Sequence, residues 1–392
     1  MYKNSGHSHP TNLLWSLQMS AWSGKMRSYL LKSGIDFQER GPREKRFQSE
    51  ILPSIGYMVL PVLELRDGTL LQDSTEAIVY LEREKAGRSL VPEEPAMAAL
   101  AWLLNVFGSD GFHKPGMHYR WNFMDEHGSF VAYNFALSGP KPDEDGDSSG
   151  IAAALFKLAS GYCQMLGITP STIPTIVDSF WDGMAILGRH FERFPYLLGN
   201  QPSIADCGLM TMLYAHLSRD PTPASTMKNR AVNVLLWTER MNKSAAQAGD
   251  FASGSDGYFD IRNLPDTLRD FLRYMFMDYG PELEAVIKAY NEYASPSNSL
   301  KTGYVFGSEQ RPFNAHPVFS SIDYKIRGHD FHRGAMVDSV YQYQFVCEII
   351  DRLPAQARNT LCDVLTGAGG DWMINLRAEK RIAYSDYLYH AT

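Results

Sequence analysis

One segment constrains the fold more than any other part of the chain: residues 57–85 read YMVLPVLELRDGTLLQDSTEAIVYLEREK. Two apolar runs in it, VLEL and TLLQ, flank Asp67-Gly68. An Asp-Gly pair tolerates the positive φ angles of a tight turn, so the segment predicts a β-hairpin. A helix is expected directly after the hairpin, because Asp73 or Ser74 can cap its first turn and apolar residues then recur on one face.

Pro61 stands at the start of the first strand of this hairpin. Proline cannot donate a hydrogen bond to a neighbouring strand, so this strand end is expected at an edge or in a bend. An X-Pro linkage is also the one peptide bond in which the cis form costs little. A cis bond here would turn the backbone of Leu60 outward.

The chain begins with a similar alternation of elements. Residues 12–19, NLLWSLQM, have the length and composition of a buried strand, and a helical pattern runs from about Ser23 to Ser33-Gly34, where glycine ends the helix. The strand therefore delivers Ser20 and Ser23 to the first turn of a helix. The expected order is strand, helix, mixed segment, strand, strand, helix.

Composition excludes several classes of protein. A chain of 392 residues is long enough for two domains, and its 37 Lys and Arg against 44 Asp and Glu leave no basic surplus for nucleic acid. The four cysteines form no C-x-x-C pair, which favours a reducing compartment over a zinc site or a disulfide framework. The polar N-terminus and the lack of a ~20-residue apolar stretch predict a cytoplasmic protein without signal peptide or membrane span.

Four motifs in this order resemble those of the glutathione transferases. They are MSAWSGKMR with Ser20, LPVLEL with Pro61, QDSTEAIVYLE with Asp73-Ser74, and FPYLLGNQPSIADCGLMTMLYAHL, in which Ser203 and Asp206 can form a capping box. The resemblance covers residues 12 to about 245. It implies the glutathione transferase fold, in which an α/β thioredoxin-like domain precedes an all-α domain, and it also implies a homodimer.

The resemblance divides the chain into three parts. Residues 1–92 would form the thioredoxin-like glutathione-binding domain and residues 93–245 the all-helical domain that binds an electrophile. Residues 246–392 exceed a typical member and are expected to form a mostly helical C-terminal extension of unknown role. A composition rich in Pro, Gly, Ser and acidic residues predicts an exposed loop at 139–150, and a second connection is expected at 243–264.

Ser20 occupies the position of the catalytic residue of this family. A hydroxyl donor at a helix N-terminus favours the thiolate of bound glutathione, whose thiol would otherwise titrate near ~8.5. Because Ser20 is not a cysteine, mixed-disulfide chemistry should be lost and attack of the thiolate on an electrophile should remain. The alternative is that Ser20 and Ser23 merely cap the helix.

The resemblance also implies which residues bind glutathione. Asp73 would take the amino group of the γ-glutamyl end, Ser74 its carboxylate, and the Leu60 backbone the cysteinyl unit. Alternatively, Asp73 and Ser74 only cap a helix and Pro61 is an edge-strand proline. The stretch GYMVLP lacks the Lys or Gln that many relatives use for the glycine carboxylate, so the residue at that end stays open. The full predicted glutathione-binding set is Ser23, Leu60, Pro61, Gln72, Asp73 and Ser74.

An aromatic segment at 111–123, GFHKPGMHYRWNF, suits an apolar acceptor. Arg120 could also support the thiolate. The alternative is a helix-breaking loop with core aromatics and solvated histidines. The histidine pairs at 7/9 and 329/332 lack further ligands, so no metal site is predicted. The predicted electrophile pocket comprises Trp22, His113, Tyr119, Arg120 and Trp121.

The sequence thus predicts a serine-type, glutathione-dependent transferase acting on a small hydrophobic electrophile, with glutathione as co-substrate. Conjugation, ether or halide displacement, and isomerisation all begin with the same thiolate. The alternative is a binding or scaffold protein that keeps the fold without turnover.

Overall fold

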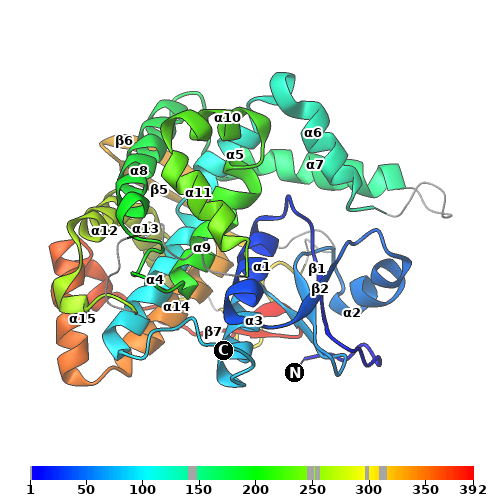
Figure 1. Ribbon diagram of the computed structural model, residues 1–392, viewed down its shortest axis with the longest axis horizontal. Coiled ribbons are helices and arrows are strands. Elements are labelled where there is room, and N and C mark those ends of the chain that lie inside the picture. The colour runs from blue at the N-terminus through cyan, green and yellow to red at the C-terminus, as the bar shows by residue number, and fades with distance from the viewer. Residues whose placement is uncertain (1, 140–147, 245–250, 252–256, 296–299, 309–315) are drawn as a thin grey trace.

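The computed structural model describes residues 2–139, 148–244, 251, 257–295, 300–308 and 316–392 (Figure 1). Its N-terminal part is built on a four-stranded sheet with the order β2-β1-β3-β4. The strands are β1 (Asn12–Trp15), β2 (Phe37–Arg40), β3 (Val62–Glu64) and β4 (Leu70–Gln72).

The sheet is mixed. Strand β1 runs parallel to β2 and antiparallel to β3, and Leu14 of β1 lies opposite Leu63. Strands β3 and β4 form the predicted hairpin, with Leu63 opposite Leu71 and a turn in which Gly68 has φ 85°. A glycine is required there because a side chain disfavours that backbone conformation.

Three helical segments accompany the sheet: α1 (Ala21–Ser33), α2 (Leu52–Ile55), which continues a π-helical turn at Phe47–Ile51, and α3 (Ser74–Arg83). Helix α1 ends at Gly34, which has φ 73° and donates its N–H to the carbonyl of Leu30. This is the predicted stop, and α3 follows the hairpin as predicted. The order of these elements is that of a thioredoxin-like domain.

Helices make up the middle of the chain. They are α4 (Pro95–Asp110), α5 (His113–Trp121), α6 (Met124–Ala136), α7 (Ser148–Met165), α8 (Ile173–Arg193), α9 (Ile204–Met212), continued by the turn η2 (Leu213–Leu217), α10 (Pro221–Arg230) and α11 (Val232–Met241). Helix α4 therefore begins just after the thioredoxin-like elements. The predicted loop at 139–150 falls mostly outside the described residues, as does much of the connection at 243–264.

The predicted capping box at the start of α9 is confirmed. The carboxylate of Asp206 accepts from the backbone N–H of Ser203 at 3.0 Å. It also accepts from the N–H of Leu197 at 2.9 Å and from Nε1 of Trp237 at 3.1 Å. These bonds satisfy a carboxylate that is completely buried, as a buried charge requires.

The last third combines helices with two hairpins. Its elements are η3 (Ile261–Asn263), α12 (Asp266–Asp278), α13 (Gly280–Tyr293), β5 (Val318–Ile326), β6 (His329–Met336), α14 (Val337–Asp351), α15 (Ala355–Gly367), η6 (Asp371–Ile374), β7 (Ile382–Ser385) and β8 (Leu388–Ala391). In α12 the apolar residues Leu268, Phe271, Leu272, Met275 and Phe276 are buried.

These C-terminal elements pack against both preceding parts of the chain. Helix α14 lies along α4, where the rings of Phe345 and Trp102 meet edge to face at 4.8 Å. The β7–β8 hairpin returns to the N-terminal sheet, where Tyr384 of β7 donates its hydroxyl to Oε1 of Gln72 in β4. There Tyr387 donates its hydroxyl to the carbonyl of Leu70 at 3.1 Å.

A buried charge cluster holds the β5–β6 hairpin against the helices. Glu282 of α13, 2% exposed, pairs with Lys114 of α5 and with Arg333 of β6, and accepts from the hydroxyl of Tyr324 at 3.1 Å. Removing one partner from such a cluster would leave an uncompensated buried charge. The cluster therefore holds α5, α13 and β6 together.

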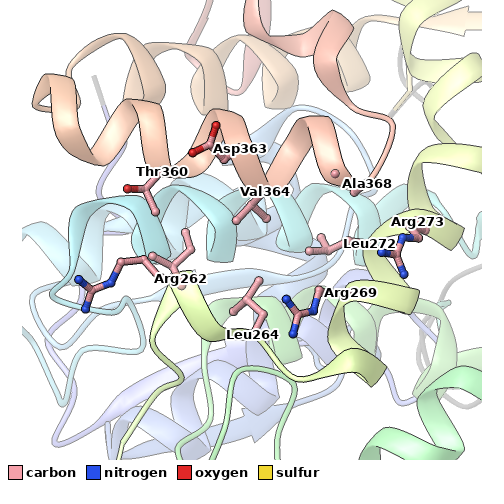
Figure 2. Close-up of a pocket in the computed structure, with 11 residues that line it drawn as sticks. Arg262, Leu264, Arg269, Leu272, Arg273, Thr360, Asp363, Val364 and Ala368 are labelled. Carbon is pink, nitrogen blue, oxygen red and sulfur yellow. The ribbon is translucent and has the colours of Figure 1, made fainter.

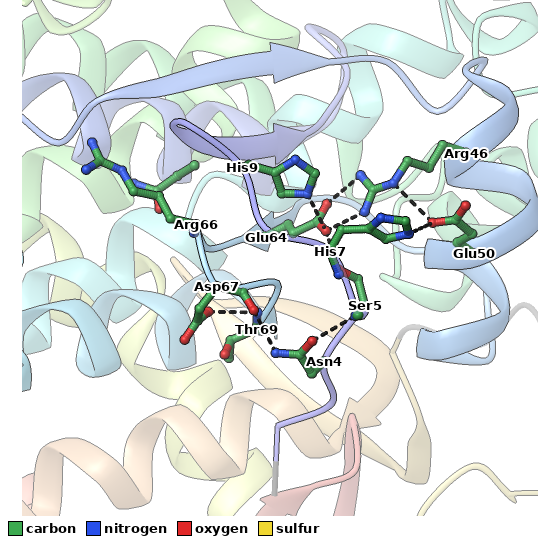
Figure 3. Close-up of polar contacts among 12 residues, drawn as sticks. Asn4, Ser5, His7, His9, Arg46, Glu50, Glu64, Arg66, Asp67 and Thr69 are labelled. Carbon is green, nitrogen blue, oxygen red and sulfur yellow. Dashed lines mark hydrogen bonds and ion pairs between the residues drawn. The ribbon is translucent and has the colours of Figure 1, made fainter.

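The N-terminal arm is fastened to the sheet by a second cluster, around Glu64 (Figure 3). Its carboxylate accepts from Ser5 at 2.5 Å, Trp15 at 3.0 Å and Arg46 at 2.8 Å, and it contacts His9 at 3.0 Å. Burial alone would raise the pKa of Glu64, but these hydrogen bonds outweigh it and hold that pKa at about 2. The ring of His9 therefore contacts a carboxylate that holds the N-terminal arm against the sheet.

None of the helices in the described ranges is long and apolar enough to cross a membrane.

Candidate active site

Ser20 is the N-cap of α1 and borders a cavity. Its backbone is extended, with φ −78° and ψ 121°, and its Oγ accepts from the N–H of Ser23 at 3.4 Å. The same hydroxyl donates to the carbonyl of Leu60 at 3.3 Å. The capping alternative thus describes the geometry of Ser20, but it does not exclude chemistry, because the half-buried hydroxyl also lines the cavity.

The predicted backbone turn is present at Leu60. The Leu60–Pro61 peptide bond is cis, as predicted. The Leu60 carbonyl accepts a hydrogen bond from the hydroxyl of Ser20. The two groups that are predicted to contact the cysteinyl unit of glutathione therefore lie side by side.

Asp73 and Ser74 lie at the N-terminus of α3, with Asp73 as the N-cap and Ser74 as the first helical residue. Asp73 has φ 65° and caps the helix, its Oδ1 accepting from the N–H groups of Thr75 at 2.7 Å and Glu76 at 3.3 Å. Ser74 is 2% exposed, and its Oγ has no hydrogen-bond partner among the described residues. Both residues line a small cavity together with Pro61 and Gln72.

Two adjoining cavities lie beside Leu60. The larger, of about 210 Å³, lies between Ser20 and α5, and the smaller, of about 40 Å³, lies over the start of α3. Trp22, Val59, Leu60 and His316 border both. The rings of Trp22 and His316, 4.7 Å apart, stand where the cavities join.

The aromatic segment at 111–123 forms helix α5, so the alternative of a helix-breaking loop is wrong. Four of the five predicted electrophile residues line the larger cavity: Trp22, His113, Arg120 and Trp121. The three from α5 are spaced seven and eight residues apart, which places them on one face of the helix.

Two predicted site residues point elsewhere. Tyr119 accepts a hydrogen bond from Nε1 of Trp181 at 3.0 Å and stacks on Phe123, on another face of α5. Ser23 is completely buried, and it is not among the residues that border either described cavity. Its contribution is the backbone N–H that it donates to Ser20.

Arg120 is a structural clamp. Its guanidinium donates to Asp220 at 2.7 and 2.9 Å, and to the carbonyls of Met19 at 3.2 Å and Ala215 at 2.9 Å. A contact of 2.6 Å with Nε2 of His216 occupies the fifth N–H. No donor is left for a thiolate, so Arg120 shapes the cavity without offering it a free hydrogen bond.

Two histidines of the larger cavity differ in charge. Burial, assisted by the nearby His316 and Arg333, lowers the pKa of His113 to about 3, so its ring is neutral. Burial would also lower the pKa of His316, but Asp338, at 3.0 Å from its Nδ1, raises it. The ion pair of His316 and Asp338 therefore lies beside a neutral His113.

The order of the elements, the Ser20–Leu60 contact and the start of α3 all point to one kind of domain. Residues 14–89 match the family model of the glutathione S-transferase N-terminal domain. Together with the mixed sheet and the helices that follow it, this match confirms the predicted fold class. The Ser20 hydroxyl, the Leu60 backbone and the start of α3 all lie within the matched residues.

Solved structures of glutathione transferases resemble part of the chain at low identity. One from Rhodospirillum rubrum is 17% identical, with a TM-score of 0.35, over 58% of this chain and 86% of its own. A β-etherase from Sphingobium is 17% identical, with a TM-score of 0.38, over 59% and 95%. One from Phanerochaete chrysosporium is 13% identical, with a TM-score of 0.41, over 62% and 100%. A comparison with curated proteins found no match.

The C-terminal segment contributes residues that the sequence did not indicate. Five of them border the smaller cavity together with residues of the N-terminal domain: His316, Asp338, Gln342, Tyr384 and Tyr389. The motif resemblance ends near residue 245, so no family pattern pointed to them. The one local signal is the spacing of Asp338 and Gln342, which places two polar groups on one face of α14.

A further cavity, of about 530 Å³, lies between α12 and α15, away from every predicted site residue (Figure 2). Three arginines border it, and each pairs with a nearby carboxylate: Arg262 with Asp260 at 2.6 Å, Arg269 with Asp266 at 3.4 Å, and Arg273 with Asp270 at 3.1 Å. Their charges are thus already compensated within the chain. The groups that suit thiol chemistry lie in the two cavities at Ser20.

Proposed function

We propose that this protein is a glutathione-dependent transferase in which Ser20 stabilises the thiolate of bound glutathione. The observation that carries the proposal is the Ser20 hydroxyl, which lines the larger cavity and lies 3.3 Å from the carbonyl of Leu60, a residue that borders both cavities. The match of residues 14–89 to the glutathione S-transferase N-terminal domain supports it.

The expected chemistry follows from the two cavities. The tripeptide would enter along the start of α3, and its sulfur would reach Ser20 at the N-terminus of α1. Donation from the hydroxyl and the positive end of the helix both favour the anion, and the thiol proton passes to solvent. The thiolate then forms a C–S bond with the electrophile, and in a displacement the leaving group departs with the bonding electron pair.

The larger cavity would hold the electrophile. Its walls are mostly apolar and aromatic, with neutral His113 and the indole of Trp121 among them. Such a lining favours a small hydrophobic acceptor over a charged one. A homodimer and a cytoplasmic location stay predictions from the sequence, and analytical ultracentrifugation of the full chain would test the first.

Ultraviolet titration of the thiolate of bound glutathione tests the role of Ser20. In Ser20→Ala the bound thiol should titrate at a higher pH than in the wild type, and the glutathione-dependent rate should fall about 10²- to 10³-fold, as for other lost donors to a reacting anion. Ser20→Thr keeps a hydroxyl and should retain most of both properties. Ser28→Ala is the matched control, because that hydroxyl donates to the Lys25 carbonyl within the same helix.

Two results would contradict this role. An unshifted thiol in the wild-type complex would show that Ser20 is only a helix cap. Binding of glutathione without turnover on any electrophile would favour the alternative of a binding or scaffold protein.

A further inference from the structure

Three buried polar atoms without hydrogen-bond partners border the smaller cavity. They are Oγ of Ser74, Oδ1 of Asp338 and Oε1 of Gln342, and no described residue satisfies them. The side chains are 2%, 5% and 7% exposed, so bulk water does not solvate them freely. Buried polar groups without a partner cost free energy, and three at one cavity indicate that a ligand completes their hydrogen bonds.

Two of the three atoms can only accept. Oδ1 belongs to an Asp338 carboxylate whose other oxygen is held by His316 at 3.0 Å, and Oε1 is the carbonyl oxygen of the Gln342 amide. Burial would raise the pKa of Asp338, but His316 outweighs it and lowers that pKa, so the carboxylate is charged. The matching ligand group is a donor with positive charge, and an ammonium group offers three N–H bonds.

The acceptors are held in place relative to α3. Tyr341 of α14 donates its hydroxyl to the Glu76 carboxylate, and Tyr384 of β7 donates to Oε1 of Gln72. Asp338 and Gln342 are four residues apart on α14, so both face the start of α3 together. Binding therefore needs little reorganisation of these elements.

We propose that the C-terminal segment completes the thiol-binding site, with Asp338 and Gln342 accepting from the free amino group of a γ-glutamyl thiol in place of Asp73, whose Oδ1 caps α3. This inference rests on the proposed function and extends it to residues beyond the family motifs. The ligand carboxylate would lie at the N-terminus of α3, where Ser74 still has a hydroxyl to donate. The site then selects thiols that carry a free α-amino group.

Calorimetric titration of the full-length protein tests the inference with two ligands, glutathione and glutathione acetylated on its amino group. The wild type should bind the acetylated form at least about tenfold more weakly, because two acceptors then lose a charged donor. In Gln342→Leu, glutathione should bind about tenfold more weakly while the acetylated form changes little, so the preference shrinks. Gln342→Glu keeps an acceptor and should retain the preference.

Glu348→Gln is the matched control, since Glu348 lies on the same helix and pairs with Arg381 away from the cavity. Unchanged binding of both ligands by a folded Gln342→Leu protein would overturn the inference and leave the proposed function standing. Equal loss of both ligands would also overturn it, because it would show a general change of the site. If the wild type binds neither ligand, the proposed function fails first and this inference with it.

Discussion

Glu64 shows how this protein stabilises a buried charge at the level of a single residue. The side chain is fully buried in the sheet, and four groups hydrogen-bond to its two oxygens: Ser5, His9, Trp15 and Arg46. A carboxylate in such a setting is stable only while every donor is present. The position was expected only as part of an apolar strand.

Glu64→Gln should reduce the free energy of unfolding by about 3–5 kcal/mol at pH 7, because it leaves Arg46 without its buried counter-charge. The pKa of Glu64 is about 2 when folded, below the ~4.3 of an unfolded glutamate, so its contribution is fully present above ~4.3 and is lost as pH falls toward 2. Urea unfolding between pH 7 and pH 3 measures both effects. The variant should lose less stability over this range than the wild type.

Glu50→Gln is the control for this prediction. Glu50 pairs with the same Arg46, but 40% of its side chain is exposed. Exposed pairs contribute at most about 1 kcal/mol, so this change should be small. Equal losses in the two variants would show that burial of Glu64 has no special role.

At the scale of elements, the crossing of α4 and α9 joins the helices of the middle part. A Cβ on Gly208 would lie 2.5 Å from the carbonyl oxygen of Asn105, and one on Gly108 would lie 2.4 Å from the backbone nitrogen of Leu209. Both are backbone atoms, which cannot rotate away as the end of a flexible side chain can. The two glycines therefore allow the helix backbones to approach directly.

Gly208→Ala should destabilise the protein by about 1–3 kcal/mol or more, because the helices must separate to admit the methyl group. Gly188→Ala on α8 is the matched control, since its added Cβ meets nothing within 4 Å. There the better helix propensity of alanine should stabilise by about 0.5–1 kcal/mol. Thermal unfolding of both variants gives the comparison, and a neutral Gly208→Ala would contradict the tight crossing.

At the scale of the whole molecule, the two ends of the chain are joined. Tyr387 accepts from the backbone N–H of Lys3 at 3.1 Å and donates to the carbonyl of Leu70 at 3.1 Å. The carbonyl of Tyr387 accepts from the hydroxyl of Tyr57 at 3.0 Å. The C-terminal segment is therefore held to the sheet that carries the proposed site.

Tyr387→Phe should cost about 1–3 kcal/mol, because it leaves the buried carbonyl of Leu70 without its partner. Amide hydrogen exchange should show lost protection in β4 and in residues 382–391 together. Tyr133→Phe, at a side chain that is 69% exposed, should change neither. Loss of protection in the hairpin alone would contradict the coupling of the two ends.

Features that depend on a few neighbouring residues followed from the sequence. The turn at Gly68, the stop at Gly34 and the capping box at Ser203 and Asp206 all rest on backbone preferences or hydrogen bonds over one to four positions. The same locality explains why Ser20 was expected at a helix start. Such preferences are visible in a single sequence because the interacting atoms are close along the chain.

Only the tertiary structure decided which side chains share the cavities. Helical spacing did not reveal that α5 presents Arg120 and Trp121 to the cavity and Tyr119 to Trp181, since that depends on what packs on each face. Nor could any local pattern place Gln342 and Ser74 at one cavity, because that placement depends on how α14 packs after more than 260 intervening residues. The sequence by itself determined the frame around Ser20, while long-range packing determined what completes it.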